Sequence, residues 1–393
     1  MNILLCPLSD PGYLYPAIAV GRQLRADSAD NHVSLLVQSA AVPRAASAGL
    51  PLVLADDYGG PRSFRVFRWF YEGLGQYRTI LRVAREARAD VLVTSVLCHG
   101  ALLAAEVLDI PVVVLGLAAH LWEYQAGGQD EPEQPVQRSW RTRDMLRYYS
   151  LMRDEAGIPG HFASSPDHPL LGTMVLLRGD PALEYPGAVL PERVQHVGPC
   201  TWEPRPDPAE VGAVMAHVDR VGKPVVYVHL GRTFGGASLW PRLNAAFTGG
   251  PFQAVVEQGR SRDPRPAPGS DILLVRKPWM GPLIDRAGLV LTSGTSAPVL
   301  AGLLRGRLLA VSPAGSEQPM LATACVRAGV ALPVVGRVPA DPAAELRSAW
   351  QDQAMRARAR QLGERLARAD GAKRAAGIIQ RIAAGRPARI SRA

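Results

Sequence analysis

The chain has little cysteine, with four in 393 residues. Cys6, Cys98, Cys200 and Cys325 lie far apart in the sequence, and no two of them have CxxC spacing. This usage fits a reducing cytoplasm and gives no signal for a metal site. We therefore expect a cytoplasmic protein that needs no metal.

Long apolar runs are also missing. A helix that crosses a bilayer needs about 20 apolar residues, and no stretch of the sequence reaches that length. Residues 1–7 lack the basic segment and the long apolar segment of a signal peptide. They predict a first β-strand instead, and we expect no membrane span.

Acidic residues are fewer than basic ones, 35 against 44, so the formal net charge is +9 and the isoelectric point is about 9.7. This balance could indicate nucleic-acid binding, as could residues 64–77, where arginines alternate with aromatics. Most of the arginines, however, are spread along predicted helices rich in Ala and Gly. We prefer solvated helix faces and a positive cleft for a diphosphate, and we expect no nucleic acid.

The residues that are present describe a packed globular protein. Hydrophobic residues make up 47%, charged residues 20%, and the mean hydropathy is +0.02, which suits about two domains. Short apolar runs alternate with helical segments, and this pattern predicts an α/β protein with parallel sheets. Loops are expected over residues 7–16 and 127–137, and a helix over residues 17–26.

The best linker is the proline-rich stretch 198–208, after which the strand–helix pattern restarts. We predict one domain over residues 1–203, a second over 204–384 with a C-terminal helix that crosses back, and a tail over 385–393.

Residues 289–330 are the most informative stretch. They predict strand, turn, helix, strand, loop and helix, so two consecutive loops leave the same edge of a parallel sheet, where such folds bind ligands. The first loop offers hydroxyls and a helix N-terminus, which suit phosphate oxygens. The second offers a carboxylate and an amide, which suit sugar hydroxyls. The predicted nucleotide-sugar contacts are Ser293, Gly294, Thr295, Ser296, Glu317 and Gln318.

Two other segments follow strands of the second half. Gly231, Arg232 and Thr233 come after the strand predicted at 225–228, where an arginine could offset diphosphate charge or lie in a solvated loop. Lys277 and Trp279 follow the strand predicted at 272–275. Trp279 could stack on a nucleobase or fill the core.

With these residues in place, nearly the whole chain resembles a GT-B glycosyltransferase. It is similar to the actinobacterial natural-product (antibiotic) glycosyltransferases of the UDP-glycosyltransferase superfamily. The segments that carry the resemblance are residues 12–16, 90–94, 110–112, 197–199, 226–231, Gly306 and 313–318. The family fold has two Rossmann-like domains whose parallel sheets face each other across a cleft, the first binding the acceptor and the second the nucleotide-sugar. The resemblance also implies that residues 64–77 form an acceptor-site helix lined with aromatics.

The usual donor motif is altered in this chain. An ungapped comparison from Gln318 places Ser293 where the family has a diphosphate-binding His, and Thr295 where it has Gly. The acidic residue that follows in relatives falls on Ala301. Scaffold and sugar-binding pair are therefore recognisable, while the phosphate-binding motif is degenerate.

The catalytic positions are altered as well. Tyr13 occupies the place of the general-base His, and Ser95 the place of the acid that orients it. A phenol with a pKa of about 10 is a poor base at neutral pH, so Asp10 in the same loop is the better candidate, followed by His99. His120 and His161 are weaker candidates.

The resemblance implies inverting, metal-independent transfer of a sugar from a UDP- or dTDP-sugar to a small-molecule acceptor, with the nucleotide-sugar as co-substrate and no other cofactor. It leaves a homodimer open. The alternatives are an NDP-sugar 2-epimerase of the same fold and a non-catalytic partner protein that binds nucleotide-sugars. A dehydrogenase reading is weak, because no GxGxxG follows the first strand.

Overall fold

The computed structural model describes residues 1–55, 67–158, 160, 162, 165–230, 236–258, 265–315, 317–334, 338–339 and 341–385. Of residues 67–72 and 236–238 it describes the backbone alone. Two compact units make up the chain. The first comprises Met1–Trp202 and Ala369–Ala393, and the second comprises Glu203–Arg368. Which unit binds the acceptor and which the donor remains a prediction.

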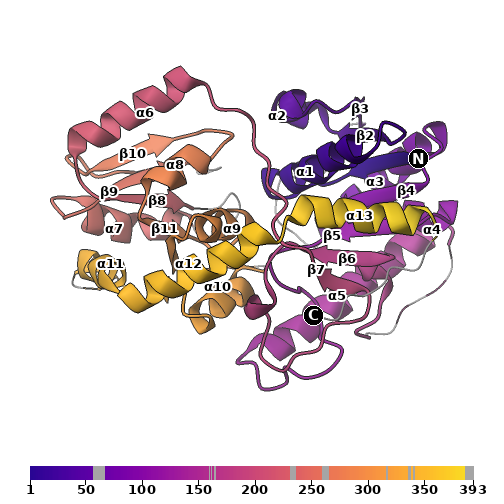
Figure 1. Cartoon of the computed structure of the whole chain (residues 1–393). Helices are drawn as coiled ribbons and strands as arrows, with labels where there is room; N and C mark the ends of the chain where they lie inside the picture. The colour runs from indigo at the N-terminus through magenta and orange to yellow at the C-terminus, as the bar shows by residue number, and fades with distance from the viewer. Residues whose placement is uncertain are drawn as a thin grey trace. The chain divides into compact units, whose positions relative to one another are not determined.

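The first unit contains a parallel sheet that has seven strands in its described part, in the order β3-β2-β1-β4-β5-β6-β7 (Figure 1). Its strands are short and mostly apolar, as expected for a sheet covered on both faces. They are β1 (Asn2–Cys6), β2 (His32–Val37), β3 (Leu52–Leu54), β4 (Val91–Ser95), β5 (Val112–Leu115), β6 (Met174–Leu177) and β7 (Val194–His196). The α-helices of this unit are α1 (Pro11–Asp27), α2 (Val42–Ala45), α3 (Phe67–Glu86), α4 (His99–Leu108), α5 (Gln134–Glu155) and α13 (Gly371–Ala383).

The core of the first unit joins the two ends of the chain. Helix α13, yellow in Figure 1, lies alongside α1. Its buried residues Ala375 and Ile379 belong to the same apolar cluster as Leu14 and Ile18 of α1 and Ile3 of β1. The helix that ends the described chain therefore completes the core around the first strand.

The second unit repeats the design with a parallel sheet of six strands in its described part, in the order β10-β9-β8-β11-β12-β13. These are β8 (Val225–His229), β9 (Gln253–Glu257), β10 (Ile272–Val275), β11 (Leu289–Thr292), β12 (Leu308–Val311) and β13 (Ala331–Pro333). The helices are α6 (Pro208–Val221), α7 (Gly236–Phe247), α8 (Gly281–Arg286), α9 (Ser296–Leu304), α10 (Gln318–Arg327), α11 (Pro342–Gln351) and α12 (Gln353–Arg368). The predicted α/β class with two parallel sheets is confirmed.

The predicted loop at residues 7–16 is wrong in its second half, because α1 begins at Pro11. Asp10 has the extended backbone of an N-cap, with φ −71° and ψ 141°. Pro11 then starts the helix, since its fixed φ suits the first turn and its missing N–H would have no partner there. Pro16 lies inside the helix, so it does not mark the end of the loop.

Two other predicted loops are also shorter. Helix α5 begins at Gln134, inside the loop expected over residues 127–137, with Pro135 in its first turn. Helix α6 begins at Pro208, the last residue of the expected linker, where the Asp207 carboxylate accepts a hydrogen bond from the Ala209 N–H at 2.9 Å. In both places the proline that suggested a turn lies in the first turn of a helix.

Candidate functional site

The two loops that the sequence places at one sheet edge do leave neighbouring strands there. Strands β11 and β12 pair in parallel, with Leu289 opposite Leu308 and Thr292 opposite Val311. Both strands therefore end at the same edge, and the Ser293 and Ser312 loops follow them directly. This arrangement confirms the predicted strand order within residues 289–330, and such an edge is where parallel α/β sheets bind ligands.

The turn between β11 and α9 carries two buried hydroxyls. Ser293 is 2% exposed. Neither its Oγ nor the Oγ1 of Thr295 has a hydrogen-bond partner among the described residues. A buried hydroxyl without a partner costs roughly 1–3 kcal/mol, so both groups can donate to an acceptor that binds at this sheet edge.

The residue between them is Gly294, and its backbone conformation requires a glycine. Its φ is +86°, which favours glycine. A Cβ built on it would lie 2.9 Å from the carbonyl oxygen of Gln318 and 3.4 Å from the Cβ of Ala322. The turn therefore rests directly against the start of α10, and the two predicted loops form one site.

Helix α9 presents an uncapped N-terminus at this turn. Thr295 occupies the N-cap position with extended backbone, but its side chain does not cap the helix, and no acidic residue lies in the first turn. The positive end of the helix dipole is therefore not neutralised from within the helix. Together with the two hydroxyls, it forms an anion-binding arrangement.

The predicted sugar-binding pair begins α10. The Oε1 of Gln318 accepts the N–H of Ala314 at 3.0 Å, and the Gln318 N–H donates to the carbonyl of Gly315 at 3.3 Å. This side chain is 3% exposed and its acceptor atom is in use, so its NH₂ group is what it offers to a ligand. Glu317 stands at the N-cap of the same helix.

The segment after β10 is less open than the sequence suggested. The Lys277 ammonium pairs with Glu210 of α6, with Nζ and Oε1 3.0 Å apart. The Lys277 N–H donates to the Oε2 of Glu257 at 3.4 Å. Trp279 is 2% exposed, and this burial favours the core role of the two roles that the sequence left open.

Gly231, Arg232 and Thr233 lie outside the described residues, and so does His161. Sequence reasoning did not single out Glu257, which is 7% exposed and closes β9 at the same edge. A carboxylate at the end of an apolar strand was the signal that could have identified it. Its contact with the Lys277 N–H joins the ends of β9 and β10.

In the first unit, the β1–α1 connection holds two of the catalytic candidates. The Oγ of Ser95, at the end of β4, accepts the N–H of Leu8 at 3.0 Å and so ties this connection to the sheet edge. The carbonyl of Asp10 accepts the N–H groups of Tyr13 and Leu14, both at 2.9 Å. Asp10 and Tyr13 are both half-buried, Asp10 at the N-cap of α1 and Tyr13 in its first turn.

His99 begins α4 and is 1% exposed. Burial lowers the pKa of its imidazole to about 4, since desolvation disfavours the charged form. Its ring lies edge-on to Tyr149, with centroids 6.2 Å apart. The imidazole is therefore neutral at pH 7, weakly basic and enclosed.

His120 follows β5 and belongs to a buried polar network. The Glu184 carboxylate accepts hydrogen bonds from the backbone N–H of His120 and from the Tyr124 hydroxyl, both at 2.9 Å. It also lies 3.1 Å from His196 Nε2. Burial would raise the pKa of Glu184, but hydrogen bonds and charge from His196 and His120 hold it below its usual range. Burial lowers the pKa of His120 to about 4.

Arg138 of α5 ties this network to the following loop. Its guanidinium bonds the Glu131 carboxylate at 3.0 Å and the Tyr124 hydroxyl at 2.9 Å, and lies over the Tyr124 ring. It also donates to the carbonyls of His120 and Trp122 at 2.5 and 3.1 Å. These bonds fix the loop after β5, which extends from the same edge of the first sheet as Asp10.

No group of three or more His, Cys, Asp or Glu side chains in the described part of the chain is arranged to hold a metal ion. None of the described helices combines the length and apolar character needed to cross a bilayer.

Comparison with solved structures gives matches over nearly the full length. The glycotransferase of kitacinnamycin matches with a TM-score of 0.73 and 20% identity, covering 97% of this chain and 98% of that one. SsfS6, a glycosyltransferase of Streptomyces sp. SF2575 complexed with thymidine diphosphate, matches with a TM-score of 0.61 and 18% identity over 95% and 98%. Glycosyltransferase VinC in complex with dTDP matches with a TM-score of 0.62 and 14% identity over 98% and 100%.

The chain has the GT-B fold. No protein-family model matches its sequence, and no curated protein matches it. At this level of identity the likeness shows the fold, while function has to be argued from the site. The candidate donor site of the second unit comprises the Ser293–Gly294–Thr295 turn and the start of α10, and the catalytic candidates lie in the first unit.

Proposed function

We propose that the chain is an inverting, metal-independent glycosyltransferase that moves a sugar from a UDP- or dTDP-sugar to a small-molecule natural-product acceptor. The observation that carries the proposal is the pair of buried, unpartnered hydroxyls of Ser293 and Thr295 beside the uncapped N-terminus of α9. The full-length fold match to glycosyltransferases, two of them holding thymidine diphosphate, supports the same function.

The diphosphate would lie against the β11–α9 turn. Its oxygens would accept the hydroxyls of Ser293 and Thr295 and the first N–H groups of α9. Gly294 permits this approach because it carries no side chain between the hydroxyls. The hydroxyls replace the imidazole that relatives use, so the site binds the diphosphate with neutral donors and a helix dipole.

The sugar would lie toward the start of α10. Gln318 would donate its NH₂ group to a sugar hydroxyl, while its Oε1 keeps the Ala314 N–H. The Glu317 carboxylate would accept a second hydroxyl. A donor and an acceptor on adjacent residues fit neighbouring hydroxyls of a hexose.

Asp10 would act as the base. Its carboxylate would take the proton of an acceptor hydroxyl, and the oxygen would attack the anomeric carbon opposite the nucleotide. The bond from that carbon to the diphosphate oxygen breaks, configuration inverts, and charge develops on the leaving diphosphate. The Ser293 turn and α9 would stabilise that charge. His99 is enclosed and Tyr13 is a phenol, so both fit positioning roles better.

Calorimetric titration with dTDP and UDP is the first test, followed by incubation of dTDP- and UDP-sugars with a panel of small hydroxylated acceptors. We expect nucleotide binding and transfer with inversion, unchanged by EDTA. Tight binding without transfer would instead favour the non-catalytic partner protein. Interconversion of the donor alone would favour the epimerase, and no binding of either nucleotide would contradict the proposal.

A further inference from the structure

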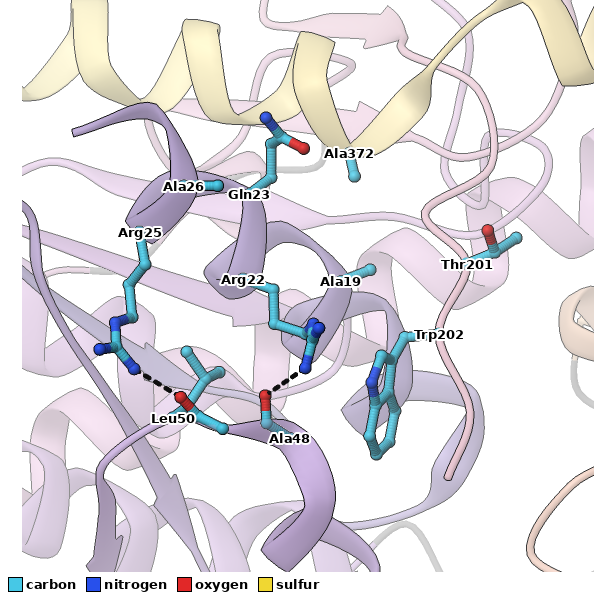
Figure 2. Close-up of a pocket in the computed structure, with 11 residues that line it drawn as sticks. Ala19, Arg22, Gln23, Arg25, Ala26, Ala48, Leu50, Thr201, Trp202 and Ala372 are labelled. Carbon is cyan, nitrogen blue, oxygen red and sulfur yellow. Dashed lines mark hydrogen bonds between the residues drawn. The ribbon is translucent and has the colours of Figure 1, made fainter. Parts of the chain in front are cut away.

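A pocket of about 530 Å³ lies on the first unit (Figure 2). It is formed by α1, the segment before β3, residues 201–202 and the first turn of α13. This volume is within the range of small-molecule sites. The described lining residues all belong to the first unit, and none of them is a residue of the Ser293 turn. They are Ala19, Arg22, Gln23, Arg25, Ala26, Ala48, Gly49, Leu50, Thr201, Trp202 and Ala372.

Small residues create the space in this pocket. Ala19, Ala26 and Ala48 lie along its α1 and pre-β3 sides, and Ala372 borders it from α13. Trp202 stands at one side as the largest apolar group, held edge-on against Tyr15 with ring centroids 5.1 Å apart. The pocket therefore offers a flat aromatic wall beside methyl groups, which suits a flat apolar body.

Two arginines give the pocket its charge. Figure 2 shows both guanidinium groups reaching from α1 toward residues 48–50. Arg22 Nη1 donates to the Ala48 carbonyl at 2.8 Å, and Arg25 Nη1 donates to the Gly49 carbonyl at 2.5 Å. A guanidinium has five N–H donors, so each keeps donors for a ligand while the carbonyl fixes its position.

Among the described residues that line the pocket there is no carboxylate. Arg22 and Arg25 are three positions apart on one helix face, where like charges repel. Their bonds to Ala48 and Gly49 are to neutral carbonyls. An anion bound near the two guanidinium groups would offset this repulsion and accept hydrogen bonds from their remaining N–H groups.

We infer that this pocket binds a small organic anion with a flat apolar body, of the aryl carboxylate class. The carboxylate contacts Arg22 and Arg25, and the ring lies toward Trp202 and the alanines. The ligand also touches Thr201 and Trp202, the last residues before the second unit begins at Glu203. This site is independent of the proposed transferase function.

The test is calorimetric titration of the full chain with 2-naphthoate, and with 2-naphthamide as the neutral counterpart. We expect 2-naphthoate to bind and 2-naphthamide to bind at least tenfold more weakly. Arg22→Gln and Arg25→Gln should each weaken 2-naphthoate about tenfold, the usual effect of losing a charged hydrogen bond. Arg85→Gln, at an exposed arginine of α3 away from the pocket, should leave the affinity unchanged.

Ala26→Trp provides a second variant that keeps both arginines. Ala26 is exposed on α1, so a larger side chain there occupies the pocket without entering the core. We expect it to abolish 2-naphthoate binding while circular dichroism and the dTDP affinity stay unchanged. Equal binding of the amide and the acid, or binding that survives both Arg→Gln changes and Ala26→Trp, would overturn the inference.

Discussion

A Cβ at Gly294 would lie 2.9 Å from the carbonyl oxygen of Gln318. Ordinary contacts of this kind start at about 3.4 Å, so no side chain fits between the β11–α9 turn and α10. The phosphate-facing turn and the sugar-facing helix start are thus held at backbone contact. Their separation cannot vary without moving α10.

Gly294→Ala should therefore damage both stability and donor binding. The φ of +86° alone costs a non-glycine residue about 1–2 kcal/mol, and the contact with Gln318 adds to it. We expect the midpoint of thermal unfolding to fall and the calorimetric affinity for dTDP to drop at least tenfold. Gly212→Ala is the matched control, since this exposed glycine of α6 has no atom within 4 Å of an added Cβ. It should keep or raise the midpoint.

Ser293→Ala and Thr295→Val should move stability and affinity in opposite directions. Removing a buried hydroxyl that has no partner is neutral or stabilising by up to about 1 kcal/mol. Losing a donor to a diphosphate should weaken dTDP binding about tenfold for each variant. Urea unfolding and calorimetry measure the two effects. A loss of stability with unchanged dTDP affinity would show that the hydroxyls serve the fold and not a ligand.

Asp10→Asn should lower kcat by about 10²–10⁴, because the amide cannot accept the acceptor proton. The affinity for dTDP should not change, since Asp10 belongs to the first unit. Tyr13→Phe and His99→Gln should retain most of the turnover. Steady-state kinetics with a saturating donor separates these outcomes, and full activity in Asp10→Asn would remove this carboxylate from the chemistry.

Buried histidines should make the fold sensitive to mild acid. Burial lowers the pKa of His99 and of His120 to about 4, and of His168 to about 3, against about 6.5 in an unfolded chain. Between these values the unfolded chain binds protons that the folded chain does not, so stability falls as pH drops from about 6.5 to 4 and is level above 7. Each histidine contributes up to about 1.4 kcal/mol per pH unit.

Urea unfolding at several pH values measures this slope. His168→Phe should flatten it by about one third, since His168 is 2% exposed and packs edge-on against Trp122 with centroids 5.5 Å apart. His32→Gln, at an exposed position of β2, should keep the slope of the parent chain. An unchanged slope in His168→Phe would mean that this histidine is not the source.

Much of the fold could be predicted because its strands are buried on both faces. Such strands appear in the sequence as short continuous apolar runs, and for this reason residues 289–330 show the two strands that the structure contains as β11 and β12. The site edge followed from the same logic, because loops after parallel strands meet at one side of the sheet. The start of α1 was missed because Pro11 and Pro16 look like loop residues until Asp10 is known to be an N-cap.

Contacts between distant segments could not be predicted. The network of Glu131, Arg138 and Glu184 comes from separate loops and a helix, and no local pattern links them. The burial of Trp279 and the pairing of Lys277 with Glu210 depend in the same way on packing. The sequence names the residue types at an edge, while packing decides which of them a ligand can reach.

The position of α13 has a consequence for the newly made chain. Ala375, Ala376, Ile378 and Ile379 complete the apolar cluster around α1, yet they are synthesised after the whole second unit. The first unit therefore leaves the ribosome with part of its core uncovered. The second unit is contiguous in sequence and can fold before α13 is synthesised. Synthesis of α13, and not of strands β1 to β7, is the step that completes the core of the first unit.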